Sequence, residues 1–332
     1  MSLQIDHVTK RFGSTVALDA LTFDVASGEV FGFLGANGAG KTTTMRICLG
    51  IIKPDAGEIR WGNRPVGDLP RGTWGYLPEE RGLYPRMGVL DQLVYFATLY
   101  GAAPERARRE AMAWLTRFHI RDYAERRAEE LSKGNQQKVQ FIAAILHGPD
   151  VLLMDEPFTG LDPINLVMLR EAFMELRDQG RTLIFSTHQM EAAEAMCESV
   201  AIVDRGRLVA GGPLRELKRA SGRRWVRIAL EGQSPAPGWL AELRGVASIR
   251  RDATGAELEL VAGAEPAATL ADVLARGASV NRFEVVEPSL EALFIELVGR
   301  PPDDELPATV SNADSAGHAE AGASSAPAGD PA

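Results

Sequence analysis

The stretch GANGAGKTT, residues 35–43, decides the fold expected for this chain. It fits the pattern G-x-x-x-x-G-K-[ST], and it lies between an apolar segment typical of a strand and a helix expected from about 41 to 49. Glycines allow successive backbone N–H groups to surround phosphate oxygens, and the helix N-terminus adds its positive end. A chance glycine-rich turn is the alternative, but it does not account for the flanking strand and helix. The residues assigned to this phosphate site are Gly35, Asn37, Gly38, Ala39, Gly40, Lys41, Thr42 and Thr43.

A pair of adjacent carboxylates ends the apolar segment VLLMDEP, residues 151–157. Asp155, at the expected strand end, and the Thr42 hydroxyl are predicted to bind Mg²⁺. Glu156 is predicted to polarise the water that attacks a terminal phosphate. An acidic N-cap is the alternative interpretation, and it explains the pair poorly because Pro157 interrupts the chain at once.

A histidine follows the next apolar segment, RTLIFSTH, residues 181–188. Taken alone, His188 would more often be an incidental residue. After a phosphate loop and an Asp-Glu pair, a contact with the terminal phosphate is favoured.

The segment LSKGNQQK, residues 131–138, places a serine and a glycine at the start of an expected helix. Ser132 is predicted to cap that helix. Its apolar face consists of Val139, Phe141, Ile142 and Ile145. The residues themselves leave open whether this helix end also has a ligand.

Taken in order and spacing, these segments together with GLD (160–162) resemble the nucleotide-binding subunits of ABC transporters over about residues 1–215. The resemblance implies that Ser132, Gly134 and Asn135 contact the ATP held by an opposite subunit in a head-to-tail dimer. It also implies that Asp162 links the two sites and that Phe12 stacks on adenine. A core phenylalanine beside a turn is the alternative for Phe12.

Two departures from the family pattern change the expected contacts. Lys133 and Asn135 stand where the family usually has glycine and glutamine, whereas Gly134 is retained. In GYLPEERGLY, Glu79 stands where the family usually has a glutamine that contacts Mg²⁺. A carboxylate remains a hard oxygen ligand, so Glu79 is expected at the metal, and a solvated acidic loop is the alternative.

The alternation of expected elements indicates an α/β fold. With the resemblance, residues 1–215 are expected to form a P-loop NTPase domain of the ABC ATPase type, with a helical subdomain at about 86–149. The order β-α-β-β-α-β in residues 222–300 predicts a C-terminal α+β domain of ferredoxin-like type. Residues 301–332 are rich in small and acidic residues and are expected to be a disordered acidic tail.

Charge and hydropathy restrict the classes of function. The formal net charge of −9 owes much to that tail, which contains acidic residues and no lysine or arginine, so bulk charge does not suggest nucleic acid as a partner. The longest apolar runs are far shorter than the roughly 20 residues that a membrane-spanning helix needs. Any membrane-embedded part of a transporter is therefore expected on a separate chain.

The resemblance implies an ATPase subunit of an exporter, with ATP and Mg²⁺ as ligands, at the cytoplasmic face of the cell membrane. It would dimerise with a second copy or a paralogue and drive a separate transmembrane permease. The segments PEERGLYPRM, LSKGNQQKVQF and VEPSLEALFIELVG look like the ABC-2 type exporter branch, similar to sodium-extrusion ATPases. A soluble ABC-type ATPase acting on ribosomes or DNA is the alternative. Such relatives usually carry two cassettes or a long coiled coil, and neither pattern is found in this sequence.

Overall fold

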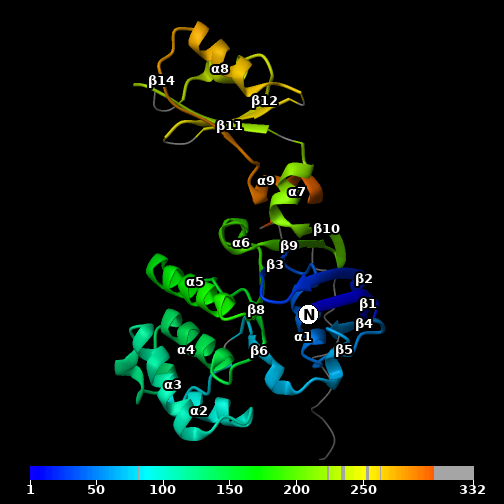
Figure 1. Cartoon of the computed structure of the whole chain (residues 1–332), viewed down its shortest axis with the longest axis vertical. Coiled ribbons are helices and arrows are strands. Elements are labelled where there is room, and N and C mark those ends of the chain that lie inside the picture. The colour runs from blue at the N-terminus through cyan, green and yellow to red at the C-terminus, as the bar shows by residue number, and fades with distance from the viewer. Residues whose placement is uncertain (81, 223, 233–235, 252–253, 262, 303–332) are drawn as a thin grey trace, which may run out of the picture.

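The computed structural model describes residues 1–80, 82–222, 224–232, 236–251, 254–261 and 263–302. The tail expected at 301–332 therefore lies outside the described residues, apart from its first two positions. Figure 1 shows a larger α/β part that contains the N-terminus and a smaller α+β part at the opposite end of the long axis.

A six-stranded sheet runs through the larger part. Five neighbouring strands are parallel, and the hairpin partner β10 is antiparallel at one edge. In spatial order the strands are β10 (Arg207–Pro213), β9 (Ser199–Asp204), β3 (Val30–Leu34), β8 (Thr182–Thr187), β7 (Val151–Asp155) and β6 (Trp74–Leu77). Every residue of β3, β7 and β8 is buried, as expected for parallel strands that are covered on both faces.

An antiparallel sheet covers one side of this central sheet. Its strands, in spatial order, are β2 (Thr15–Ala26), β1 (Ser2–Phe12), β4 (Ala56–Trp61) and β5 (Arg64–Pro65). Helix α1 (Lys41–Cys48) follows β3 through the GANGAGKTT loop. Its Met45 and Ile47 belong to the same buried cluster as Leu3 of β1 and Phe31 of β3, so the helix joins the two sheets.

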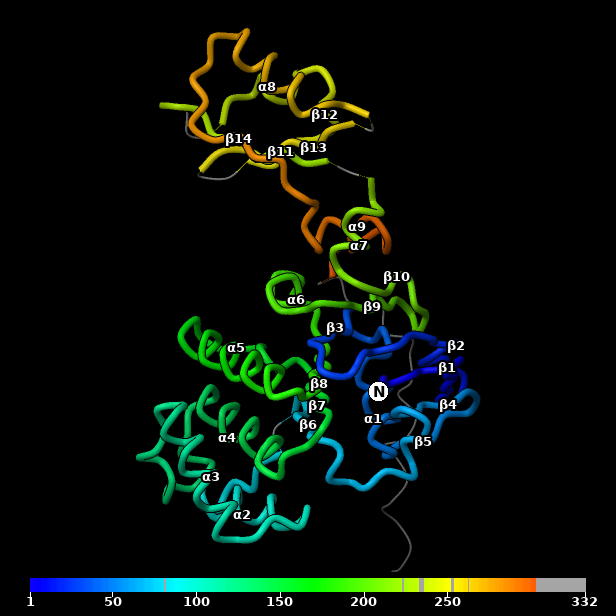
Figure 2. Tube along the Cα trace, in the orientation of Figure 1, coloured from blue at the N-terminus to red at the C-terminus, as the bar shows by residue number. Residues whose placement is uncertain are grey.

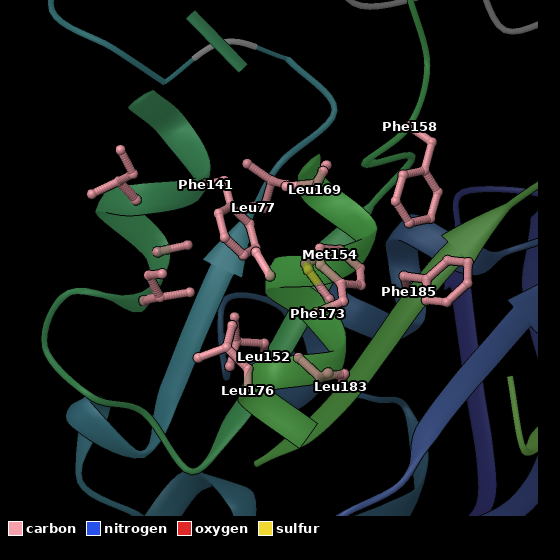
Figure 3. Packing of buried hydrophobic residues seen from close by; sticks show 14 of the residues in the cluster. Leu77, Phe141, Leu152, Met154, Phe158, Leu169, Phe173, Leu176, Leu183 and Phe185 are labelled. Carbon is pink, nitrogen blue, oxygen red and sulfur yellow. The ribbon is translucent and has the colours of Figure 1, made fainter. Parts of the chain in front are cut away.

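Helices cover the other side of the central sheet. α4 (Lys133–Ile145) and α5 (Pro163–Asp178) lie next to the strands, and α2 (Val89–Leu99) and α3 (Pro104–Arg117) pack against α4 farther from the sheet. Figure 3 shows Phe141 of α4 and Phe173 of α5 packed over the strands that carry Leu77, Met154 and Phe185. The rings of Phe141 and Phe173 stack with centroids 5.5 Å apart. Within the described ranges, no helix combines the length and the apolar character needed to cross a membrane.

The smaller part is an antiparallel sheet with the strand order β12-β13-β11-β14. Its elements are β11 (Arg224–Leu230), β12 (Val246–Arg251), β13 (Ala256–Leu260), α8 (Pro266–Ala275) and β14 (Val280–Val286). This order and connectivity are those of the expected ferredoxin-like pattern. The first helix of that expected order is only a 3₁₀ helix, Gly238–Glu242, because the segment between Pro237 and Gly245 is too short for a stable α-helix.

The smaller part is attached to the larger one through α7 (Leu214–Ala220) and α9 (Leu290–Val298), which connect the two parts in Figure 2. Glu194 of α6 (Met190–Met196) accepts a hydrogen bond from the Leu290 backbone N, at 2.8 Å, and forms an ion pair with Lys218 of α7. Leu290 and Phe294 belong to the buried cluster of the central sheet rather than to the separate cluster of the C-terminal sheet. The C-terminal sheet is thus held by contacts to α6, the helix that begins just after His188.

Candidate functional site

A cavity of about 260 Å³ lies between the start of α1 and the segments that follow β6 and β7. The predicted phosphate loop and both acidic segments converge on it, although they are far apart in sequence. Its lining residues are Ala17, Asn37, Gly38, Gly40, Lys41, Thr42, Thr43, Glu79, Asp155 and Glu156.

The loop needs glycine for steric reasons. Gly40 has φ = 105°, and a Cβ there would lie 2.7 Å from the Ala17 carbonyl oxygen. A Cβ on Gly35 would lie 2.4 Å from the Val203 carbonyl oxygen. Because these contacts are with backbone, they cannot be relieved by a side-chain rotation, and the loop can lie this close to β2 and β9 only with glycine.

Lys41 is buried at the base of the cavity, with 6% of its surface exposed. Its Nζ donates to the Gly35 carbonyl oxygen at 2.7 Å and lies 3.9 Å from the Glu156 Oε1 atom. Burial lowers the pKa of the Lys41 ammonium, while the charges of Glu156, Asp155 and Glu79 act in the opposite sense. The ammonium group is therefore fixed beside the loop by backbone acceptors and nearby carboxylates.

Asp155 accepts hydrogen bonds through both carboxylate oxygens. The Thr42 Oγ1 donates to its Oδ2 at 2.6 Å, and the Ser186 Oγ donates to its Oδ1. A hydroxyl and a carboxylate oxygen held this close suit a hard divalent cation such as Mg²⁺, so the donor set fits the predicted metal.

Glu79 lines the same cavity from an exposed position beyond β6. Burial raises the pKa of Glu79, and the negative charges of Asp155 and Glu156 act in the same sense. Glu79 is thus a solvent-exposed carboxylate at the edge of the cavity, and its contact with Mg²⁺ stays a prediction.

Glu156 is buried, and its backbone is in the left-handed region with φ = 47°. Its Oε1 accepts from His188 Nδ1 at 2.8 Å and from the His188 backbone N at 3.1 Å, and its Oε2 accepts from Thr187 Oγ1 at 3.2 Å. Because an ionised carboxylate can only accept, this contact favours the proton on Nδ1. A non-glycine residue in this strained conformation is typical of a functional site.

The remaining predicted residues do not line the cavity. Ser132 caps α4 by accepting from the Asn135 N at 3.4 Å, as predicted, and it is exposed. Asp162 caps α5 in the same way, accepting from the Asn165 N at 2.9 Å. A Cβ on Gly134 would lie 3.0 Å from the Asn165 Nδ2, so the two helix starts are neighbours.

Phe12, the last residue of β1, has 49% of its surface exposed and is approached by the Lys10 Nζ, 5.5 Å from the ring centroid. The alternative of a core phenylalanine is therefore wrong. Stacking on adenine stays a prediction.

The hydroxyl groups at the end of β8 also belong to the site, although they were not among the predicted residues. Ser186 and Thr187 bond to Asp155 and Glu156, and Ala17 lines the cavity from β2. The available signal was a pair of hydroxyl residues at the end of an otherwise apolar strand, next to a strand that ends in Asp-Glu.

Comparison with known proteins identifies the family. Residues 18–159 match the family model of ABC transporters, and residues 212–298 match that of the ATP-binding protein DrrA1-3-like, C-terminal domain. An uncharacterized ABC transporter ATP-binding protein of Bacillus subtilis, YhaQ, is 45% identical over 297 residues, which cover 90% of this chain and 98% of YhaQ. The chain belongs to the ATP-binding proteins of ABC transporters. Members of this family are ATPases.

Further relatives of this ABC protein include the linearmycin resistance ATP-binding protein LnrL of Bacillus subtilis, which is 31% identical over 90% of this chain and 98% of LnrL. A Nod factor export ATP-binding protein I of Burkholderia thailandensis is 33% identical over 91% of this chain and 98% of that protein. A solved ATP-binding subunit of an ABC transporter shares the fold with a TM-score of 0.63, at 31% identity, over 67% of this chain and 94% of that one.

Proposed function

We propose that this ABC protein is the ATP-hydrolysing subunit of an exporter, which binds MgATP in the cavity and drives a separate transmembrane permease. The convergence of Lys41, Thr42, Asp155 and Glu156 on one cavity carries the proposal. The names of the resistance and export relatives support an exporter rather than an ATPase acting on ribosomes or DNA.

The start of α1 provides the phosphate site. Gly40 precedes the helix and supplies no side-chain cap, so the first N–H groups of α1 are available to phosphate oxygens. Lys41 adds a buried positive charge, which gains strength in a site of low dielectric constant.

Thr42, Asp155 and Glu79 would hold Mg²⁺ through a hydroxyl and carboxylate oxygens. When bound, the ion neutralises charge on the phosphate groups during transfer. Ser186 keeps the Asp155 carboxylate in place by donating to the oxygen that Thr42 does not use.

Glu156 would act as the general base towards the attacking water. His188 would orient the Glu156 carboxylate. The contact of Nδ1 with Glu156 leaves the His188 Nε2 as the ring nitrogen that can face a terminal phosphate. Thr187 restrains the second carboxylate oxygen of Glu156.

A second subunit would complete the site. Ser132, Gly134 and Asn135 lie at an exposed helix start rather than at the cavity, so the nucleotide they contact would be the one bound by a partner ATPase, a second copy or a paralogue. Asp162, beside that helix start, would connect the two sites, and Phe12 would stack on the adenine. The assembly would lie at the cytoplasmic face of the cell membrane, on its permease, with no role for nucleic acid.

The replacement Glu156→Gln tests the proposal. We expect the variant to bind MgATP, to elute as a dimer when ATP is present, and to hydrolyse ATP at least about a hundredfold more slowly, because it lacks a general base. Glu191→Gln is the matched control, since Glu191 is an exposed carboxylate just beyond His188. Turnover and elution volume are measured for both variants. Equal turnover in Glu156→Gln and wild type would exclude the general base, and purification with ribosomes instead of a membrane protein would exclude the exporter.

A further inference from the structure

One polar side chain is buried in the apolar run of α4. Gln140 has 5% of its surface exposed, and its chain neighbours Val139 and Phe141 are fully buried. A glutamine in such a place costs free energy unless its amide group forms hydrogen bonds. Its contacts therefore explain what it does there.

The Gln140 amide is bonded to the backbone on both sides of Glu79. Its Nε2 donates to the Pro78 carbonyl oxygen at 3.1 Å and to the Glu80 carbonyl oxygen at 3.1 Å. If the amide were flipped, its Oε1 would face the two carbonyl oxygens, which are also acceptors. Only the orientation with Nε2 towards them is therefore favourable. Its Oε1 has no hydrogen-bond partner within the described part of the chain. An apolar residue of the same size would fill this space without leaving a buried acceptor unpaired. The glutamine therefore indicates a role for the two hydrogen bonds that it donates.

These contacts connect two functional segments. One is the Glu79 segment, which lines the cavity with Lys41 and Asp155. The other is α4, whose first turn carries Ser132 and Gly134. We infer that Gln140 is a positioning residue, which holds Glu79 at the metal side of the cavity and transmits displacements of α4 to it.

This inference rests on the proposed function and adds a form of regulation to it. When the start of α4 engages the nucleotide of the second subunit, the helix and its Gln140 move as one body, and Glu79 moves with them. Nucleotide binding at the second subunit's site would thus change the position of Glu79, the proposed metal ligand, in this subunit's site.

The same helix provides a matched control. Gln136 lies one turn earlier, and its Nε2 donates to the Ala128 carbonyl oxygen at 2.8 Å, away from the cavity. Gln137 is unsuitable, because it donates to Pro157, next to Glu156. Gln140→Met and Gln136→Met each remove one amide at nearly constant volume.

The first experiment needs no nucleotide. A spin label is attached through Glu80→Cys, an exposed position, in a protein whose Cys48 and Cys197 are replaced by alanine. We expect Gln140→Met to increase the mobility of the label, whereas Gln136→Met leaves the spectrum of the parent protein unchanged. An unchanged spectrum in Gln140→Met would overturn the inference, even if the protein hydrolyses ATP as proposed.

The second experiment measures the Mg²⁺ concentration that gives half-maximal ATP hydrolysis. We expect about a fivefold increase for Gln140→Met, from the loss of ordinary hydrogen bonds, and no change for Gln136→Met. Equal values for the two variants would contradict the inference. If the wild-type protein does not hydrolyse MgATP, the proposed function is refuted, while the label spectra still decide the role of Gln140.

If Gln140→Met unfolds, Gln140→Glu replaces it, because a carboxylate facing two carbonyl oxygens should release the segment at unchanged size.

Discussion

The starts of α1 and α4 are alike in sequence and opposite in environment. Each helix begins with a lysine, Lys41 or Lys133, close to a glycine. Lys41 is buried and α1 has no side-chain cap, whereas Lys133 is exposed and α4 is capped by Ser132. The first is thus prepared for an anion inside its own chain, and a ligand for the second has to come from outside.

Replacement of the two lysines should give the largest difference between these helix starts. Lys41→Met removes the buried charge, and we expect ATP hydrolysis to fall by about a hundredfold or more. Lys133→Met removes an exposed, screened charge and should leave ATP binding by the isolated subunit unchanged. Titration calorimetry and steady-state turnover measure both effects. A loss of ATP binding in Lys133→Met would show that the exposed helix start serves its own nucleotide.

The two glycines provide a comparison in stability. Gly40→Ala combines φ = 105° with an overlap on the Ala17 backbone, and it should lower the free energy of unfolding by about 3 kcal/mol. Gly134→Ala meets only the movable Asn165 amide and replaces a poor helix former, so its stability should be unchanged or higher by up to about 1 kcal/mol. Urea unfolding of the nucleotide-free protein measures both values.

ATP-induced dimerisation then separates structure from function at Gly134. We expect Gly134→Ala to be folded and impaired in dimerisation, since its methyl group would displace the Asn165 amide from Asp162 at the helix start that is proposed to contact the partner's nucleotide. A variant that dimerises like wild type would place the partner contact elsewhere on α4.

The cap of α4 should have a smaller effect. Ser132→Ala removes the acceptor for the Asn135 N, which should cost about 1 kcal/mol. Ser289→Ala is the control, because Ser289 caps α9 by accepting from the Ala292 N at 3.1 Å. Both variants should unfold at lower urea concentration, and only Ser132→Ala should weaken ATP-dependent dimerisation. Equal dimerisation in the two variants would show that Ser132 caps α4 and makes no contribution to dimerisation.

Local chemistry explains how much of this molecule could be predicted from its sequence. The loop at 35–43 and the cap at Ser132 follow from spacing and residue type, and α1 begins at its expected first residue, 41, and ends one residue before the expected 49. The hydroxyl of Ser186 and the amide of Gln140 were not predicted, because their partners lie 31 and about 60 residues away. Such contacts depend on which strands and helices become neighbours, and the spacing of residues along the chain does not contain that information.

The smallest expected effect distinguishes Glu79 from its neighbour Glu80. The raised pKa of Glu79 means that its ionised form is disfavoured in the folded protein, chiefly by burial and then by Asp155 and Glu156. Glu79→Gln should therefore raise the melting temperature of the nucleotide-free protein near neutral pH. Glu80→Gln should raise it less, because Glu80 does not line the cavity and is the weakest of the charges that raise the pKa of Glu79.

The pH dependence of this difference provides the check. Above the ordinary pKa of a glutamate, the folded wild type bears the cost of ionised Glu79, and the amide of the variant avoids that cost. As the pH falls through the raised pKa, Glu79 takes up a proton and the wild type recovers the same stability. The melting temperatures of wild type and Glu79→Gln should therefore converge towards acid. A difference that stays constant with pH would assign the effect to packing, and Glu79 would then lie outside the electrostatic field of Asp155 and Glu156.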